Sequence, residues 1–158
     1  MRRRPEIPPE VTPAHRLRVA CIYVRSGIDP MRPEEHAEVD RQRGARRFAD
    51  QWGWLPDRIV MIEDLDRCAC RVEIREGFHV LMQMLLNREL GIVITSDFER
   101  LATRWEDVRL FMARCRDADT LLAIDGEIIT EANAADVRMR CAYAVCARLE
   151  DELYPTLL

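Results

Sequence analysis

The run Arg18-Val-Ala-Cys-Ile-Tyr-Val-Arg25 is rich in β-branched and aromatic residues, and it predicts a buried strand that sets the fold. Turn residues follow it at once, in Ser26-Gly-Ile-Asp-Pro30. Similar runs occur later, at 58–62, 90–95 and 120–124. Segments with apolar residues at helical spacing alternate with these runs, at 34–52, 75–87, 106–116 and 134–153. The alternation predicts a three-layer α/β domain, in which helices flank a mainly parallel four- to five-stranded sheet and the last helix is long.

The chain of 158 residues, 48% of them hydrophobic, is long enough for one compact domain with its own core. Residues 1–17 hold many of the prolines and show no hydrophobic period, so we expect a flexible, extended N-terminal arm. We expect the domain to cover 18–153 and to end in a short tail, 154–158. No separate DNA-binding domain is expected in the chain.

The net charge of -4 does not indicate a nucleic-acid binder on bulk charge alone. The sequence contains no lysine, so all 24 basic residues are arginine. Two explanations stay open. One is the codon usage of a GC-rich genome, and the other is phosphate recognition, because the guanidinium group pairs with two phosphate oxygens at once.

No apolar run approaches the ~20 residues that a membrane span needs, and no apolar stretch follows the basic start of the chain. We therefore expect neither a membrane span nor a secretory signal. The expected location is the cytoplasm, where the six cysteines remain reduced thiols.

Motifs for nucleotide or metal binding are absent from the sequence, which has no glycine-rich phosphate loop and no zinc-hydrolase motif. Cys68-Ala-Cys70 lacks two further ligands at a suitable spacing. We expect no metal and no cofactor. The acidic residues Glu63, Asp64 and Asp66 follow the second strand, and they fit either a paired-acid or magnesium site or a solvated loop.

Arginines lie close to the ends of several predicted strands or at the start of the helix that follows. Arg25 ends the first strand beside the hydroxyl of Ser26, Arg75 opens a helix, and Arg100 and Arg104 follow the third strand. Ligands of parallel sheets bind at the carboxyl ends of the strands, so these arginines are predicted to converge on one anion. Guanidinium groups around a serine suit phosphoryl transfer without a metal. The alternative is a set of ordinary surface arginines.

Several short motifs recur here in the order of one known family. They are Tyr23-Val-Arg-Ser-Gly27, Gln42 before Gly53-Trp54, an acidic residue at Asp64, Arg75-Glu-Gly-Phe78, Glu99-Arg-Leu-Ala-Thr103, and the start of a long helix at 136–152. Together they resemble the catalytic domain of serine site-specific recombinases, the resolvase/invertase family, from about residue 18 to 152. The resemblance implies the resolvase-like fold.

In that family a serine hydroxyl attacks a DNA phosphodiester and forms a 5′-phosphoserine link without a metal or nucleotide cofactor. The resemblance places the catalytic residues at Arg25, Ser26, Gly27, Arg75, Arg100 and Arg104. It places supporting residues at Tyr23, Gln42, Asp64, Glu99 and Thr103. The implied partners are DNA, held weakly without an added DNA-binding domain, and a second copy or partner protein on the 134–153 helix, which is apolar on more than one face.

The chain departs from the family pattern at two catalytic positions. Gly27 stands where the nucleophile belongs, and Ser26 comes one residue early, where an extended chain points to the opposite side. Thr103 stands where the family has an arginine, with Arg104 one residue late. We therefore expect a recombinase-like domain with impaired DNA cleavage. The alternatives are an active small recombinase that uses Ser26, and a non-enzymatic α/β dimerisation or regulatory module.

Overall fold

The computed structural model describes residues 6–26, 33–65 and 75–140. The chain divides into two compact units, Met1–Ile128 and Ile129–Leu158, so the single domain predicted for 18–153 spans both. In the second unit residues 134–140 are helical. Thr130 and Asn133 cap this helix reciprocally, because each side chain accepts a hydrogen bond from the other residue's backbone N–H. The rest of the predicted 134–153 helix lies outside the described residues.

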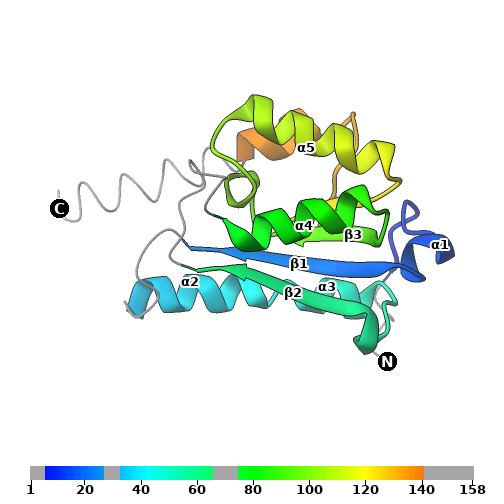
Figure 1. Ribbon diagram of the computed structural model, residues 1–158, viewed down its shortest axis with the longest axis horizontal. Helices are drawn as coiled ribbons and strands as arrows, with labels where there is room; N and C mark the ends of the chain where they lie inside the picture. Colours follow the sequence, from blue (N-terminus) through cyan, green and yellow to red (C-terminus); the bar gives the residue numbers. More distant parts are fainter. Residues whose placement is uncertain (1–5, 27–32, 66–74, 141–158) are drawn as a thin grey trace. The chain divides into compact units, whose positions relative to one another are not determined.

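A five-stranded sheet forms the centre of the first unit, with the strand order β2-β1-β3-β4-β5 (Figure 1). The strands are β1 (Val19–Arg25), β2 (Ile59–Asp64), β3 (Leu90–Thr95), β4 (Leu121–Ile124) and β5 (Glu127–Ile128). The first four pair in parallel, and β5 runs antiparallel to β4. The predicted mixed α/β fold with a mainly parallel sheet is confirmed.

Helices cover both faces of this sheet. They are α1 (Pro13–Arg16), α2 (Pro33–Arg43), α3 (Arg46–Gln51), α4 (Glu76–Leu86) and α5 (Trp105–Asp117), with the short 3-10 turns η1 (Pro56–Arg58) and η3 (Phe98–Arg100). In Figure 1, α2 and α3 lie on one side of β1 and β2, and α4 and α5 lie on the other. Helices on both faces explain why β1 and β3 are almost entirely buried and apolar.

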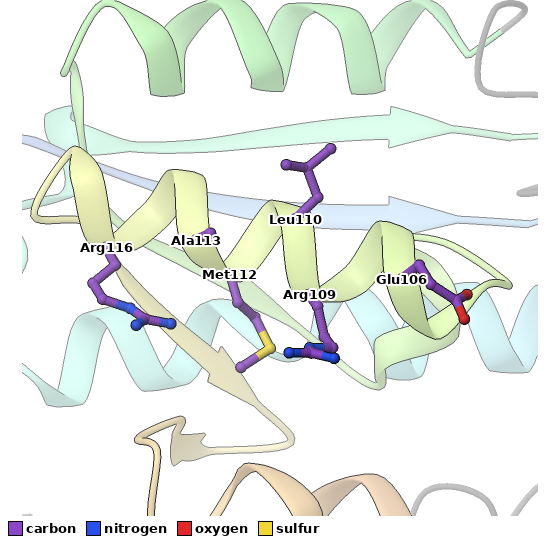
Figure 2. A pocket seen from close by; sticks show the side chains of 6 residues that line it. All are labelled: Glu106, Arg109, Leu110, Met112, Ala113 and Arg116. Carbon is purple, nitrogen blue, oxygen red and sulfur yellow. The ribbon is translucent and has the colours of Figure 1, made fainter.

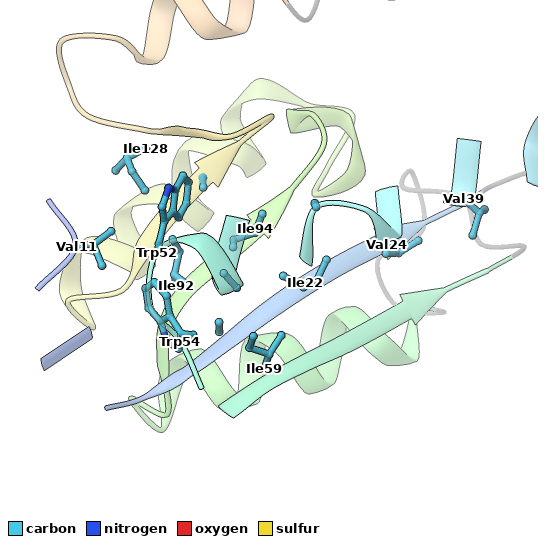
Figure 3. Packing of buried hydrophobic residues seen from close by; sticks show 14 residues of the cluster. Val11, Ile22, Val24, Val39, Trp52, Trp54, Ile59, Ile92, Ile94 and Ile128 are labelled. Atoms are coloured by element: carbon cyan, nitrogen blue, oxygen red, sulfur yellow. The ribbon is translucent and has the colours of Figure 1, made fainter. Parts of the chain in front are cut away.

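The single helix predicted for 34–52 is divided into α2 and α3. At the break, the backbone N–H groups of Ala45, Arg47 and Phe48 each donate to a carbonyl three residues back, which tightens the chain. Gly44 sits at this point and has low helix propensity. The break leaves Ala45, Ala49 and Trp52 packed on the sheet with Ile22 and Ile94, in the core cluster of Figure 3.

β4 and β5 are joined by the two residues Asp125 and Gly126, which have φ angles of 49° and 80°. Positive φ at both positions is the geometry of a tight β-hairpin turn. A side chain at Gly126 would meet the Phe48 ring, whose nearest atoms lie 2.5 Å from the position of a Cβ atom. This turn therefore connects β4 to the fifth strand, β5, which pairs antiparallel with it.

Residues 11–16 are packed on the rest of the first unit, although an extended arm is predicted for residues 1–17. Val11 is buried in the core cluster, and residues 13–16 form the helical turn α1 with Thr12 as its cap. The buried His15 belongs to this helical turn, and its carbonyl oxygen lies against Gly91 of β3. This segment therefore packs on the amino end of β3.

No helix among the described residues is both long and apolar enough to cross a membrane.

We expect Gly91→Ala to destabilise the fold by about 2–3 kcal/mol, in the range of overpacked cores. A Cβ atom at Gly91 would stand 2.0 Å from the carbonyl oxygen of His15, a backbone atom that cannot move aside alone. Gly44→Ala is the control, because its Cβ would approach the nearest backbone oxygen only to 3.2 Å. Urea denaturation of the two variants measures the difference. Equal midpoints would contradict the docking of the N-terminal segment on β3.

Candidate functional site

Asp64 organises the carboxyl end of β2. Its Oδ1 accepts a hydrogen bond from the backbone N–H of Gly77, and its Oδ2 accepts one from Phe78, both at 2.7 Å. These are free N–H groups of the first turn of α4, so Asp64 caps that helix from another element. The Tyr23 hydroxyl also donates to Oδ2, at 2.6 Å. Asp64 is therefore neither a solvated loop residue nor an open metal ligand.

Glu63, the neighbouring acid, has a different partner. Arg43 of α2 holds its carboxylate with two hydrogen bonds, from Nε at 2.6 Å and Nη2 at 3.0 Å. These bonds lower the pKa of Glu63. Asp66, Cys68 and Cys70 lie outside the described residues. Among the residues that are described, no three His, Cys, Asp or Glu side chains gather as a metal-binding group would.

Arg75 is fully buried at the start of α4. Its Nη2 donates to the Tyr23 hydroxyl at 2.6 Å and to the Arg100 carbonyl at 2.8 Å, and its Nη1 donates to the Leu101 carbonyl at 2.7 Å. Its guanidinium carbon lies 4.2 Å from the centre of the Phe78 ring. The buried Arg75 side chain, at the start of α4, is thus hydrogen-bonded to both β1 and the η3 segment.

Tyr23 connects Arg75 to Asp64. Burial raises the pKa of the Tyr23 hydroxyl, and the positive charge of Arg75 opposes this effect. The hydroxyl donates to Asp64 and accepts from Arg75, so both of its hydrogen-bonding roles are used. The predicted supporting residues Tyr23 and Asp64 therefore lie in one network with Arg75.

Gln42 and Arg100 fix the end of β1. The Gln42 side chain accepts from the Arg25 N–H at 2.9 Å and donates to the Arg25 carbonyl at 3.0 Å. Arg100 Nη1 also donates to that carbonyl, at 3.2 Å, and Arg25 Nη2 donates to the Glu99 carbonyl at 3.4 Å. Residues of α2 and of η3 therefore both hydrogen-bond to Arg25, the last residue of β1.

Three guanidinium groups meet at this edge of the sheet. Burial lowers the pKa of Arg25, and the positive charges of Arg100 and then Arg75 lower it further. Hydrogen bonds from Arg75 to the Arg100 carbonyl and from Arg100 to the Arg25 carbonyl bring Arg25, Arg75 and Arg100 together, and we name this set the arginine cluster. An anion placed here would relieve the repulsion that lowers the pKa of Arg25. The catalytic roles of the three residues stay predictions.

One residue at the edge of the cluster was missed by the sequence analysis. Glu38 of α2 accepts hydrogen bonds from both Arg41 and Arg100. Glu38 precedes Gln42 by four residues, so the two lie on the same face of α2. That spacing was the signal in the sequence, because Gln42 had already been placed at the site.

Asp97 adds a second acidic group. Its Oδ2 lies 3.5 Å from the Nε of Arg100, which is three residues away. Both side chains are nearly buried, with 8% and 12% of their surfaces exposed. Asp97 belongs to the loop after β3, the region in which the sequence predicted functional side chains.

Ser26 follows directly on β1 and is fully buried. Its backbone N–H donates to the Asp64 carbonyl at 3.0 Å, which continues the hydrogen bonding between β1 and β2 for one residue. Gly27, at the expected nucleophile position, lies outside the described residues. Ser26 is therefore next to the arginine cluster in the chain but is covered by protein.

Thr103 and Arg104 are not brought into the cluster. Both are exposed at the start of α5. The Arg104 side chain is 72% exposed, and its Nε lies 3.9 Å from an oxygen of Glu106. The prediction that Arg104 converges on the same anion as the other arginines therefore finds no support in the described geometry. Glu99 contributes only its carbonyl to the cluster among the contacts described.

An open hollow of about 410 Å³ lies along α5 (Figure 2). Its lining residues are Glu106, Arg109, Leu110, Met112, Ala113 and Arg116. Arg109, Met112 and Arg116 project to one side of the helix. None of the lining residues belongs to the arginine cluster, so the hollow is a separate surface feature.

Comparisons with known proteins support the fold. No protein-family model and no curated protein matches the sequence. The first open reading frame of transposon ISC1904 from Sulfolobus solfataricus P2 is a structural neighbour at 20% identity and a TM-score of 0.50. This match covers 68% of the chain and 66% of that neighbour, slightly less than two thirds of its length.

Two further neighbours are catalytic domains by name. The C-terminal catalytic domain of ISC1926 TnpA, an IS607-like serine recombinase, has 13% identity and a TM-score of 0.56, with 85% of each chain covered. The N-terminal catalytic domain of TP901-1 integrase has 18% identity and a TM-score of 0.57, with 85% of this chain and 97% of that chain covered. The chain therefore has the fold of serine recombinase catalytic domains.

Proposed function

We propose that this chain is a recombinase-type domain that binds DNA phosphodiesters at the arginine cluster and is impaired in strand cleavage. The observation that carries the proposal is the meeting of Arg25, Arg75 and Arg100 beside a fully buried Ser26. The neighbours that share the fold include a serine recombinase and an integrase, which supports DNA as the ligand.

The cluster is suited to a phosphate because guanidinium groups donate two hydrogen bonds in the plane that phosphate oxygens accept. Arg25 and Arg100 lie nearer the surface than Arg75, which is fully enclosed. We therefore assign phosphate contact to Arg25 and Arg100. Arg75 acts as a positioning residue, since its donors are directed at Tyr23 and at backbone carbonyls.

Cleavage requires a hydroxyl oxygen within about 3–3.5 Å of the phosphorus atom. Ser26 is enclosed on all sides, and its backbone extends the pairing of β1 with β2. A DNA phosphate at the protein surface therefore does not reach the Ser26 hydroxyl unless the residues that cover it move. The exposed Thr103 supplies no charge to the transition state. These two features support the loss of cleavage.

A second copy of the chain is the partner that we propose for the helix that begins at residue 134. Its described part carries Met139 with 56% of its surface exposed. The sequence continues the apolar pattern beyond residue 140, which favours contact with another subunit. The proposed setting is the cytoplasm, with neither metal nor cofactor.

We expect Arg25→Gln to weaken the binding of a random-sequence DNA duplex about tenfold, because one phosphate contact is lost. The slope of log affinity against log salt should fall by about 0.9 for the lost contact. Fluorescence anisotropy measures both quantities. Arg88→Gln is the matched control, because it removes an equal charge from an exposed position before β3, at the other edge of the sheet.

Folding of both variants is checked by circular dichroism, and Arg100→Gln replaces Arg25→Gln if the latter does not fold. Equal losses for the cluster variant and for Arg88→Gln would show that only net charge matters. That result would contradict a DNA site at the arginine cluster.

A further inference from the structure

Glu38 is held by two arginines from different elements. Its Oε1 accepts from Arg41 Nη2 at 2.8 Å and from Arg100 Nη2 at 2.7 Å, and its Oε2 accepts from Arg41 Nε at 2.9 Å. The Glu38 carboxylate thus accepts two hydrogen bonds from Arg41 and one from Arg100. Guanidinium groups present the same arrangement to the oxygens of a phosphate.

The exposed fraction of these three side chains increases from Arg100, in the arginine cluster, through Glu38 to Arg41. The exposed fraction of the side chain is 12% for Arg100, 20% for Glu38 and 49% for Arg41. Arg100 in turn contacts the carbonyl of Arg25, so the three side chains are continuous with the arginine cluster. A ligand that arrives from solvent meets Arg41 first.

Arg41 lies close to the carboxyl ends of the strands. Its hydrogen bonds to Glu38 raise its pKa, and the charges of Asp97 and Asp125, which follow β3 and β4, raise it further. Arg41 also shares the Glu38 carboxylate with Arg100, so it lies beside the arginine cluster although it belongs to α2. This places a fourth guanidinium group at the edge.

We propose that Arg41 and Arg100 form a phosphate-binding pair and that Glu38 occupies this pair as an internal substitute for the phosphate. The ligand is a phosphate group, either free or in a phosphodiester. A phosphate that binds must displace the Glu38 carboxylate, and this displacement requires the part-exposed Glu38 side chain to rotate into solvent. The inference rests on the proposed function only where it takes DNA as the source of the phosphate.

Removal of the Glu38 charge tests this directly. We expect Glu38→Gln to bind inorganic phosphate at least tenfold more tightly than the wild type. The probe is inorganic phosphate, and the measurement follows the Nε–H resonances of arginine side chains by NMR. Asp40→Asn is the matched control, because Asp40 lies on the same helix but pairs with Arg43 and His36 outside the cluster. We expect its affinity to stay within twofold of the wild type.

A second variant assigns the gain to Arg41. We expect Arg41→Gln, added to Glu38→Gln, to abolish the tighter binding. Equal gains for Glu38→Gln and Asp40→Asn would show a general charge effect and would overturn the proposal. A gain that survives the loss of Arg41 would overturn it as well, and so would phosphate affinity unchanged by Glu38→Gln.

Parallel titrations with a DNA duplex separate this inference from the proposed function. Tighter phosphate binding by Glu38→Gln, with no DNA binding by any variant, would support the phosphate-binding pair. The same result would contradict the proposed DNA function. DNA binding by the wild type that is weakened or unchanged in Glu38→Gln would leave the function standing and overturn the substitute role of Glu38.

Discussion

A variant that carries both Gly27→Ser and Thr103→Arg is expected to form covalent adducts with supercoiled DNA, whereas the wild type forms none. The first change supplies a hydroxyl at the expected nucleophile position, and the second supplies transition-state charge. The loss of one such electrostatic donor typically costs ~10²–10³ in rate, and the loss of the attacking group costs more. Denaturing electrophoresis of labelled DNA after incubation detects the adducts.

Two controls make this result specific. Thr103→Arg alone adds the charge without a nucleophile and should give no adduct. Gly27→Ala with Thr103→Arg changes the backbone freedom at residue 27 without adding a hydroxyl, and it should give none either. A double variant that folds and binds DNA but forms no adduct would show that the impairment has another cause.

The second large effect concerns stability. We expect Arg75→Ala to lower the free energy of unfolding by about 3–5 kcal/mol, the range found when one partner of a buried charged network is removed. The change leaves the Arg100 and Leu101 carbonyls and the Tyr23 hydroxyl without this donor, inside the protein. The midpoint of urea unfolding measures the loss.

Arg109→Ala is the control for this prediction, because Arg109 lies on the exposed face of α5 and should change the free energy of unfolding by less than ~0.5 kcal/mol. Arg75→Lys should recover only part of the stability, since a lysine amine cannot reach all three acceptors in their plane. An Arg75→Ala protein as stable as the wild type would contradict the role of Arg75 as the tie between β1, α4 and η3.

The sequence pattern was sufficient for the sheet and for most of the cluster. Buried parallel strands are continuous apolar runs, so β1 and β3 were predicted almost to the residue. Because such strands end at one edge, Arg25 and Arg100 could be placed together before the structure was known. Asp64 was placed at that edge, but its capping of α4 depends on a tertiary contact that no local pattern records.

Other features depend on contacts between distant segments. The break between α2 and α3 follows from tight backbone bonds near Gly44, in a stretch whose apolar spacing reads as one helix. The close approach of His15 to β3 depends on the missing side chain of Gly91, which lies more than seventy residues later in the sequence. The Glu38–Arg100 pair likewise joins α2 to η3 across 62 positions. Such pairings cannot be read from local periodicity.

We expect this recombinase fold to bind DNA through the arginine cluster. We expect it not to cut the DNA, because Ser26 is buried. The most direct measurement is prolonged incubation of the wild-type protein with end-labelled duplex and supercoiled DNA. Samples are then separated by native and by denaturing electrophoresis. We predict bound DNA in the native gel and no protein–DNA adduct in the denaturing gel. Wild-type adducts that Ser26→Ala abolishes would contradict the account and identify an active recombinase with a displaced nucleophile.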